Sequence, residues 1–443
     1  MSLSCSQTKH IKTSISFIPA PMAFDDVTRE MQTPGFWIKK IENPDKLLLT
    51  TKEINQLNAK TRREGVYLTN IYSLPFEPSR KRIIKNIMGL FKAYSKYYDG
   101  TSLEPVGRNY LNGERNNVLD GNIETVKNFS YAMTVTYAEM RVLPTKKHLY
   151  SSPYSFGVDK LQQTHLDLGT PVVVLAATQD KQWYYAISEI AEGWVLSDTI
   201  AFCSRKVLKD YKKMGDVSVV FSQDTDIYAN EKLTEFVDNV KMGTVLYISK
   251  INKKTFEIYM PFSKKNRKLD FKKCYVKSSD IRKGFLPYTQ RNALQQAFKF
   301  LNSPYGWGGI NGRIDCSGFL RQIYLCFGIV LPRNSYAQAK TGKVLRGFSE
   351  DDDIYMKTES VIYEAYAGIT LLQFPGHVML YLGSHKNNPY VIHALWGYEG
   401  VSEGEKEKRI YLLNRILVSG MFIGENTESG SLIERTTVMS VIK

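Results

Sequence analysis

The hydrophobic periodicity changes twice along the 443-residue chain, and these changes most strongly limit what the chain can fold into. Up to about residue 125, apolar residues recur at three- and four-residue steps, most clearly over residues 80–98, which indicates helices. Between about residues 126 and 285, short runs alternate apolar and polar residues, as strands do. Beyond residue 285, helix and strand patterns are mixed. Because the chain is too long for one ordinary core, we expect several domains.

The strand-rich part of the chain carries an aromatic pattern of its own. A strand pattern over residues 182–186 is followed, after a turn, by Gly193, Trp194 and Val195. This is the pattern of a small SH3-like barrel, in which each hairpin gives an aromatic residue to one core. Similar alternation over residues 217–281 predicts a second barrel. The expected regions are a partly helical segment (1–125), two all-β SH3-like domains (126–204 and 205–285) and a C-terminal domain that mixes helices and strands (286–443).

The basic composition is compatible with several partners. The formal net charge of +15 suits a polyanion such as nucleic acid, acidic lipid or the acidic polymers of a bacterial wall. The Lys and Arg residues are spread along the chain, without a helix-turn-helix, zinc-finger or RNA-recognition pattern. A solvated basic surface is therefore favoured, and no nucleic-acid partner is expected.

The cysteine usage and the apolar runs say little about export. The five cysteines are odd in number and widely spaced, so a disulfide framework is not expected. No run of eighteen apolar residues occurs, so no transmembrane segment is predicted. The N-terminus also lacks the apolar segment of a signal peptide. Cys5 is a candidate for a lipid anchor, and an exposed tail cysteine is the equal alternative.

Cys316 stands where a helix should begin, and this makes it a candidate nucleophile. Asp315 is suited to cap that helix, and the residues after Cys316 place an apolar face along its body. The positive end of a helix favours a thiolate, which is the nucleophilic form of cysteine. Gly308 and Gly309 upstream would let a substrate backbone approach closely.

Two histidines supply partners for this cysteine. His377 begins one strand pattern, His393 lies in the next, and the residues between them read as a turn. Antiparallel pairing would bring both imidazoles to one face. His377 would then accept the thiol proton and His393 would orient the ring of His377. Purely structural roles remain an alternative, as does a zinc site formed by Cys316 and both histidines, although no close ligand pair is present.

Five blocks of sequence closely resemble the NlpC/P60 peptidases, in the order and at the spacing found in that family. They cover roughly the last 155 residues, and the region before them resembles the helical segment and paired SH3-like domains of one branch of the family. One departure is Asn334, where many relatives have Asp. The blocks are Pro304-Tyr305-Gly306-Trp307-Gly308-Gly309, Asp315-Cys316-Ser317-Gly318-Phe319, Leu331-Pro332-Arg333-Asn334-Ser335, Gly376-His377-Val378 and Ile392-His393-Ala394.

The resemblance implies a papain-like α+β fold for the C-terminal domain and a cysteine endopeptidase activity. Family members cut peptidoglycan stem peptides, most often between D-γ-glutamyl and a diamino acid, and no metal or organic cofactor is expected. The implied catalytic residues are Cys316 as nucleophile, His377 as base and His393 as orienting residue. The implied substrate-binding residues are Tyr305, Asp315, Ser317 and Arg333.

The domain order implies a further preference and leaves alternatives open. In relatives with this order, the first SH3-like domain narrows the cleft and helps to recognise a free N-terminal L-Ala. An acidic group would be needed for the ammonium, and Glu139 and Asp167 lie in the corresponding domain. A non-catalytic peptidoglycan-binding protein, or a related cysteine amidase or acyltransferase, is the alternative function. The family implies the cell envelope, periplasmic or extracellular, whereas a native N-terminus would imply the cytoplasm.

Overall fold

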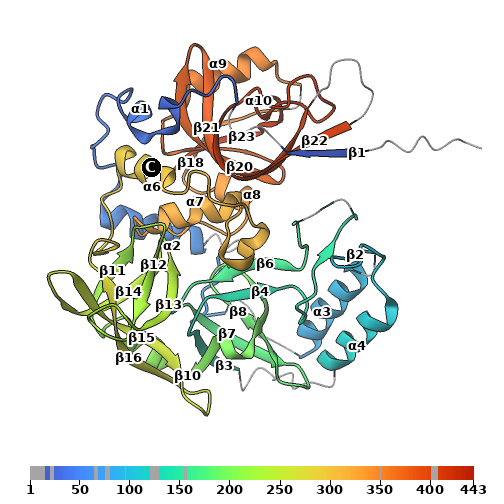
Figure 1. The fold of residues 1–443 in the computed structure, drawn as a ribbon, viewed down its shortest axis with the longest axis vertical. Helices are drawn as coiled ribbons and strands as arrows, with labels where there is room; N and C mark the ends of the chain where they lie inside the picture. The colour runs from blue at the N-terminus through green and yellow to red at the C-terminus, as the bar shows by residue number, and fades with distance from the viewer. Residues whose placement is uncertain are drawn as a thin grey trace, which may run out of the picture.

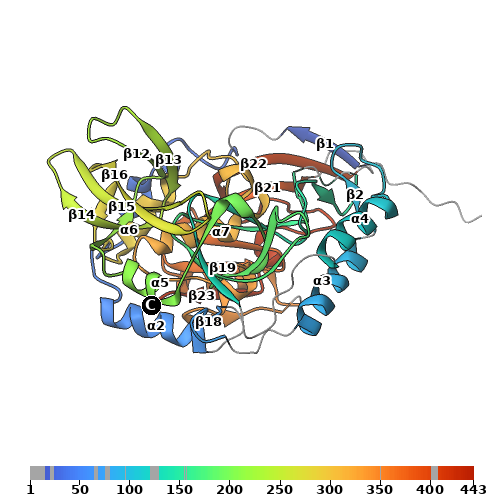
Figure 2. The same ribbon diagram turned by 90° about the horizontal axis from the view of Figure 1, so that it is seen from below.

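A computed structural model of the chain contains three seven-stranded sheets, which Figures 1 and 2 show from two directions. Among the described residues, no helix is long and apolar enough to cross a membrane. Cys5, considered above for a lipid anchor, lies outside the described residues. The structure describes residues 15–19, 24–63, 68–74, 80–94, 96–119, 129–153, 155, 157–349, 351–400 and 408–443.

The C-terminal sheet forms the upper part of the molecule in Figure 1. Helix α7 (Cys316–Leu325) packs on strands β20 and β21, and its apolar face is fully buried in the largest core of the described structure. Helices α8 (Ser335–Ala339), α9 (Ile354–Glu364) and α10 (Leu432–Arg435) complete this part. The strands, in sheet order, are β1 (Ile15–Pro19), β22 (Lys408–Gly420), β21 (Asn388–Gly400), β20 (His377–His385), β19 (Thr370–Phe374), β23 (Val438–Val441) and β18 (Lys343–Gly347).

The first of the two strand-rich regions forms an antiparallel sheet. Trp183 and Trp194, the aromatic residues of the predicted barrel, are buried in one hydrophobic cluster. Helix α5 (Arg205–Tyr211) follows the last strand. The strands, in sheet order, are β10 (Ile200–Cys203), β3 (Ser130–Thr134), β7 (Pro171–Ala177), β8 (Trp183–Ile187), β9 (Glu192–Leu196), β4 (Ala138–Arg141) and β6 (Gln162–Leu166).

The second strand-rich region also forms an antiparallel sheet with its own buried cluster. Its assignment as a second SH3-like barrel stays a prediction. The strands, in sheet order, are β13 (Phe236–Lys241), β12 (Asp224–Tyr228), β16 (Leu269–Lys277), β15 (Thr255–Ser263), β14 (Val245–Ile251), β11 (Asp216–Val220) and β17 (Ile281–Lys283).

The described part of residues 1–125 divides between two neighbours. Strand β1 pairs in parallel with β22, and α1 (Pro34–Ile38) packs on α6 (Gln290–Phe298). Helix α2 (Thr51–Arg63) is joined to the C-terminal region by backbone hydrogen bonds of the Asn58 side chain. Helices α3 (Arg80–Tyr94) and α4 (Arg108–Leu119) instead share a core with the sheet of the first strand-rich region, which we call the first sheet. The sequence predicted α3 correctly, but nothing in it signals which neighbour each segment contacts.

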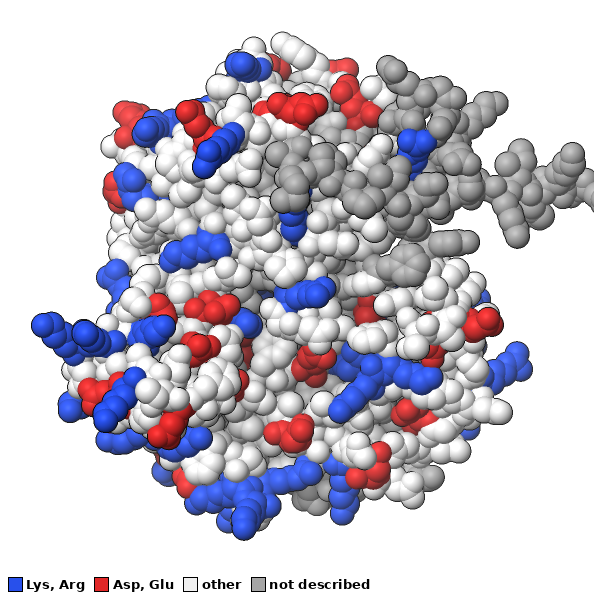
Figure 3. All heavy atoms as spheres, viewed as in Figure 1, with Lys and Arg blue, Asp and Glu red and all other residues white. Residues whose placement is uncertain are grey.

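Charge is mixed over the surface. On the face shown in Figure 3, Lys and Arg side chains are interspersed with Asp and Glu side chains over all three sheets. Such mixing limits the local potential, and it is compatible with a solvated basic surface on this face.

The turn before α7 packs against the sheet of the first strand-rich region. This turn, η3 (Trp307–Gly312), receives a hydrogen bond from the Tyr137 hydroxyl at the Gly309 carbonyl. The amide of Gln162 donates to the Gly308 carbonyl at 3.2 Å. A Cβ on Gly309 would overlap Nδ1 of His165, so this glycine admits a side chain of the first sheet. From the sequence we expected Gly309 to let a substrate backbone approach closely. In the structure, the space beside its Cα is filled by the His165 side chain.

We expect Gly309→Ala to lower the free energy of unfolding by about 2–5 kcal/mol, since it combines left-handed strain with a steric overlap. Gly309 has φ +79°, and the overlapping atom belongs to a buried ring. Gly284→Ala is the matched control, because Gly284 has φ +72° but open space around its Cβ position. It should cost only about 1–2 kcal/mol of strain. Urea unfolding of both variants measures the difference, and equal losses would contradict the packing described here.

Candidate active site

Cys316 is the first residue of α7, and Asp315 caps the helix as the sequence predicted. The Asp315 carboxylate accepts the Gly318 N–H at 2.8 Å and the Gly308 N–H at 2.9 Å. The backbone N–H groups of Val378 and Ser317 point at the Cys316 sulfur. Since Val378 directly follows His377, this contact brings the start of β20 against the cysteine.

The two histidines lie on adjacent antiparallel strands, as predicted. Nε2 of His377 lies 2.8 Å from Nδ1 of His393, and Nε2 of His393 lies 3.1 Å from Oγ of Ser419 on β22. His393 and Ser419 are fully buried. If His377 donates from Nε2 and His393 from Nε2, the chain of bonds leaves Nδ1 of His377 free to accept a proton. The two imidazoles are hydrogen-bonded to one another, which does not fit the zinc site considered above. Among the described residues, no group of three or more His, Cys, Asp or Glu side chains is arranged to hold a metal ion.

Burial sets the protonation state of this site. It raises the pKa of the Cys316 thiol to about 12, and the Asp315 charge adds to this effect. It lowers the pKa of His377 to about 3, with help from the Arg435 charge, and lowers that of His393 well below its ordinary value. The resting pair is therefore a neutral thiol and a neutral imidazole. The helix N-terminus alone had favoured a thiolate, but burial outweighs it.

Arg333 joins the predicted substrate-binding residues to the first sheet. Its guanidinium donates to Asp315 at 2.6 Å, to Oγ of Ser317 at 2.7 Å and to Oγ1 of Thr164 on β6 at 2.7 Å. Burial alone would raise the pKa of Asp315, but the Arg333 charge and the hydrogen bonds hold it below its ordinary value. The carboxylate is thus ionised and already occupied by protein partners.

A cleft of about 490 Å³ opens above Cys316, between the C-terminal region and the first sheet. Tyr305, Asp315, Ser317 and Arg333 line it together with Cys316, so the structure brings these five predicted residues to one place. His377 lines an adjoining cavity that shares Tyr305 with the cleft, and His393 is enclosed behind it. Burial raises the pKa of the Tyr305 phenol well above its usual value, so Tyr305 is a neutral hydrogen-bond donor.

Two family models match parts of the chain. Residues 302–416 match the model of the NlpC/P60 family, a range that includes Cys316, His377 and His393. The chain carries an NlpC/P60 domain. Residues 148–196 match the model of an SH3 domain of the SH3b1 type, which lies within the first predicted barrel.

The chain is similar to named relatives over short stretches. The gamma-D-glutamyl-L-lysine dipeptidyl-peptidase of Bacillus subtilis (strain 168) is 39% identical over 100 residues, which are 22% of this chain and 31% of that protein. Dipeptidyl-peptidase 6 of Lysinibacillus sphaericus is 32% identical over 111 residues, which are 25% of this chain and 34% of that protein. The matched region thus spans about a third of each relative.

One solved structure resembles nearly the whole chain in fold. It is described as a novel NlpC/P60 endopeptidase from Photobacterium damselae subsp. piscicida, with a TM-score of 0.75 and 21% identity, and the match covers 96% of both chains. The arrangement of helices and sheets in this chain therefore occurs in a second protein as well. The papain-like description of the C-terminal domain stays a prediction.

Three residues of the site were not found from the sequence. Ser419 extends the histidine chain from β22, and Lys160 and Trp307 line the cleft, with the Lys160 ammonium 4.3 Å from the Trp307 ring centre. Trp307 stands in a family-like block, so its sequence context offered a signal, whereas Ser419 and Lys160 stand in no such block.

The two acids considered for a substrate ammonium, Glu139 and Asp167, do not line the Cys316 cleft. Glu139 accepts the Asn311 N–H at 2.7 Å, and Asp167 lines a different cavity.

We expect Cys316 to be well under about 1% thiolate at pH 8 in the free protein, as a pKa of about 12 requires. Deprotonation is opposed by burial, so it should begin only above about pH 9. The difference in thiolate ultraviolet absorbance between the wild type and Cys316→Ser measures it over about pH 6–9. A step in that difference below about pH 8 would reveal a thiolate–imidazolium pair and contradict the neutral pair.

Proposed function

We propose that this chain is a cysteine endopeptidase that hydrolyses the bond between D-γ-glutamyl and a diamino acid in peptidoglycan stem peptides. The observation that carries the proposal is the 2.8 Å hydrogen bond between His377 and His393, beside Cys316 at the start of α7. The NlpC/P60 domain and relatives named gamma-D-glutamyl-L-lysine dipeptidyl-peptidases support the bond chosen. Such a substrate would be met in the cell envelope, periplasmic or extracellular.

In the proposed reaction, the sulfur of Cys316 attacks the γ-carbonyl carbon while Nδ1 of His377 takes the thiol proton. His393 accepts from Nε2 of His377 and so stabilises the imidazolium that forms. The proton then passes to the leaving amine, the C–N bond breaks and a thioester remains. Water next loses a proton to His377 and attacks the thioester, which returns the thiol. No metal or organic cofactor takes part.

The substrate-binding residues act in two ways in this proposal. Tyr305 faces the cleft as a neutral phenol, which can donate to the oxyanion of the tetrahedral intermediate. Asp315 and Arg333 form an ion pair at 2.6 Å, and Arg333 also donates a hydrogen bond to the Ser317 hydroxyl, so the pair fixes the position of Ser317. Ser317 is the member of this set whose hydroxyl lies on the catalytic helix next to the nucleophile.

Incubation with L-Ala-γ-D-Glu-diaminopimelate should release L-Ala-D-Glu, detected by mass spectrometry. Cys316→Ala removes the nucleophile and should lower the rate by roughly 10⁴-fold or more. Cys326→Ala is the matched control, because Cys326 is buried at the other end of α7 and lies outside the cleft.

Each outcome separates the alternatives. A product from the wild type and from Cys326→Ala, but not from Cys316→Ala, supports the proposal. Binding of the peptide without a product would identify a peptidoglycan-binding protein instead. Transfer of the acyl group to an added amine, without the hydrolysis product, would identify an acyltransferase.

The preference for a free N-terminal L-Ala depends on charges in the cleft. Among the described residues that line it, Asp315 is the sole carboxylate, and Arg333 binds both of its oxygens. Lys160 is the cation of the opposite wall, and burial lowers its pKa. A free ammonium therefore meets a positive rather than a negative side chain at this wall.

We expect Lys160→Glu to raise kcat/KM for the free-amine peptide relative to its N-acetyl form by about thirtyfold or more, since two unit charges about 8 Å apart interact by roughly 1–2 kcal/mol and a charge reversal counts this interaction twice. Lys160→Met should change the ratio by about half as much in free energy, because it removes a charge without reversing it. Competition between the two peptides gives the ratio directly. An unchanged ratio in both variants would place the amino end away from Lys160.

A further inference from the structure

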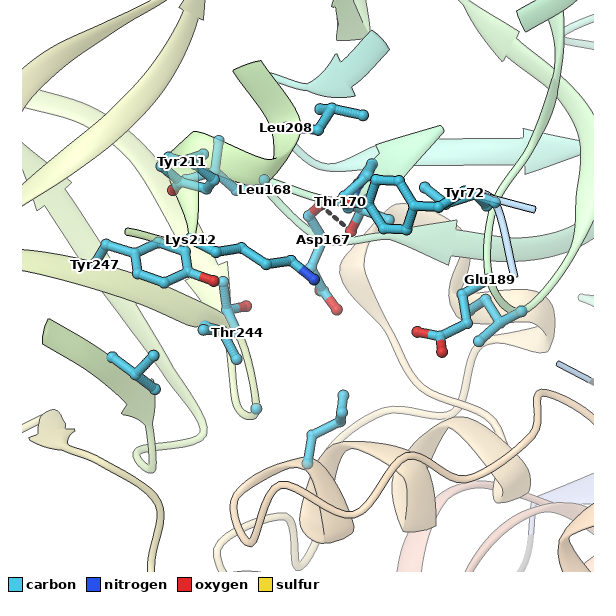
Figure 4. A pocket seen from close by; sticks show the side chains of 18 of the residues that line it. Tyr72, Asp167, Leu168, Thr170, Glu189, Leu208, Tyr211, Lys212, Thr244 and Tyr247 are labelled. Atoms are coloured by element: carbon cyan, nitrogen blue, oxygen red, sulfur yellow. Dashed lines mark hydrogen bonds between the residues drawn. The ribbon is translucent and has the colours of Figure 1, made fainter. Parts of the chain in front are cut away.

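Two cavities adjoin at Tyr305 and Gly376. One is the Cys316 cleft, and the other, of about 360 Å³, is lined by His377, so we call it the His377 cavity. A further cavity of about 600 Å³, between the two strand-rich sheets and α7, is lined by neither Cys316 nor His377, and its walls carry side chains such as Lys212 (Figure 4). A substrate that meets both Cys316 and His377 therefore extends into the first two cavities.

The proposed reaction places one side of the substrate in each of these two cavities. His377 must reach the leaving nitrogen, because the thiol proton passes from this histidine to that nitrogen. The diamino acid therefore lies in the His377 cavity, and the D-γ-glutamyl part lies in the Cys316 cleft. This placement rests on the proposed function, and it makes the side chains of the His377 cavity the ones that select the leaving residue.

Arg435 is the one permanent cation among the described residues that line the His377 cavity. The central carbon of its guanidinium lies 4.1 Å from the centre of the Phe374 ring, and the centre of the His377 ring lies 5.3 Å from the same point. A cation–π contact thus holds the guanidinium close to the histidine. Arg435 forms no ion pair within the described ranges, so its N–H groups can bind a carboxylate in a bidentate manner.

The helix that carries Arg435 is fixed by other side chains. The buried Lys357 donates from Nζ to the Glu434 carbonyl at 2.7 Å and to the Thr436 carbonyl at 3.4 Å. Ser431 and Glu434 form a capping box at the start of α10. Because α10 is held at both ends without the guanidinium, a change at Arg435 should leave the helix in place.

Glu399 supplies the opposite charge on the wall of the same cavity. Partial burial lowers the pKa of Arg435, and the Glu399 charge, which acts in the opposite direction, does not offset this. The guanidinium therefore still favours a further anion. A cation and a carboxylate that do not pair with one another match a diamino acid, whose carboxylate and side-chain amino group are separated by an aliphatic chain.

We propose that Arg435 binds the carboxylate of the diamino acid that stands two bonds from the leaving nitrogen. This carboxylate is free when the stem peptide ends at the diamino acid, whereas a longer stem has an amide there. The preferred substrate class is therefore the stem tripeptide, and Arg435 sets this preference. A guanidinium binds a carboxylate more strongly than a neutral amide, because both partners are charged.

The test compares L-Ala-γ-D-Glu-diaminopimelate with the same peptide in which that one carboxylate is a carboxamide. We expect kcat/KM of the wild type to be about tenfold or more higher for the acid than for the amide, since the amide loses a charged hydrogen bond. Arg435→Met should reduce this ratio to about one, mainly by raising KM for the acid, because the contact is made both before and during the reaction.

Two further variants serve as controls. Arg435→Lys should restore part of the ratio, because it restores the charge without the planar, bidentate geometry. Arg346→Met is the matched control and should keep the ratio of the wild type. Arg346 is also an exposed arginine of the C-terminal region, on β18, but it lines neither of the two cavities.

The outcomes separate this inference from the proposed function. A structural role of Arg435 would lower the rates on both peptides alike and keep their ratio, which would overturn the inference while cleavage upholds the proposed function. Equal rates of the wild type on both peptides would do the same. If neither peptide is cleaved, the proposed function fails, and titration of the full-length Cys316→Ala protein with both peptides decides the inference. Tighter binding of the acid, lost on addition of Arg435→Met, would uphold the carboxylate site, whereas equal binding, or none at up to about 10 mM, would overturn it.

Discussion

The ion pair between Arg333 and Asp315 holds the candidate active site together. Asp315 caps α7 and also accepts the N–H of Gly308, so one carboxylate fixes both the start of the helix and the turn before it. Arg333 fixes that carboxylate and reaches across to Thr164 on the first sheet. Removal of one partner from a buried ion pair costs about 3–5 kcal/mol, because the other charge stays buried. The position of Cys316 and the width of its cleft therefore depend on the same pair.

Burial gives this site its rigidity and also its resting chemistry. The helix N-terminus and two backbone N–H groups favour a thiolate at Cys316, but desolvation and the Asp315 charge act in the opposite direction and prevail. His377 and His393 are kept neutral for the same reason. In the proposed reaction, the base accepts the thiol proton only as the nucleophile attacks, and the Ser419–His393–His377 chain would supply the orientation that this step needs.

Local sequence patterns predicted the parts of the site that local structure creates. The Asp315 cap, the apolar face behind Cys316 and the strand pairing that joins His377 to His393 follow from residues within one helix or one hairpin. Lys160 and Ser419 reach the site from the first sheet and from β22, and no local pattern shows where these elements will pack. For the same reason, the division of residues 1–125 between two neighbours was not predicted.

The parallel pairing of β1 with β22 has a consequence for how the protein is made. Ile15 pairs with Lys408, so the first described strand finds its partner only after nearly all of the chain has been synthesised. Contacts between residues so far apart in sequence close slowly, because the loop entropy must be overcome before the contact forms. The two strand-rich sheets, in contrast, consist of neighbouring segments that are complete much earlier on the ribosome. The C-terminal sheet can therefore close only after β22 has been synthesised, when every strand of the two strand-rich sheets is already available.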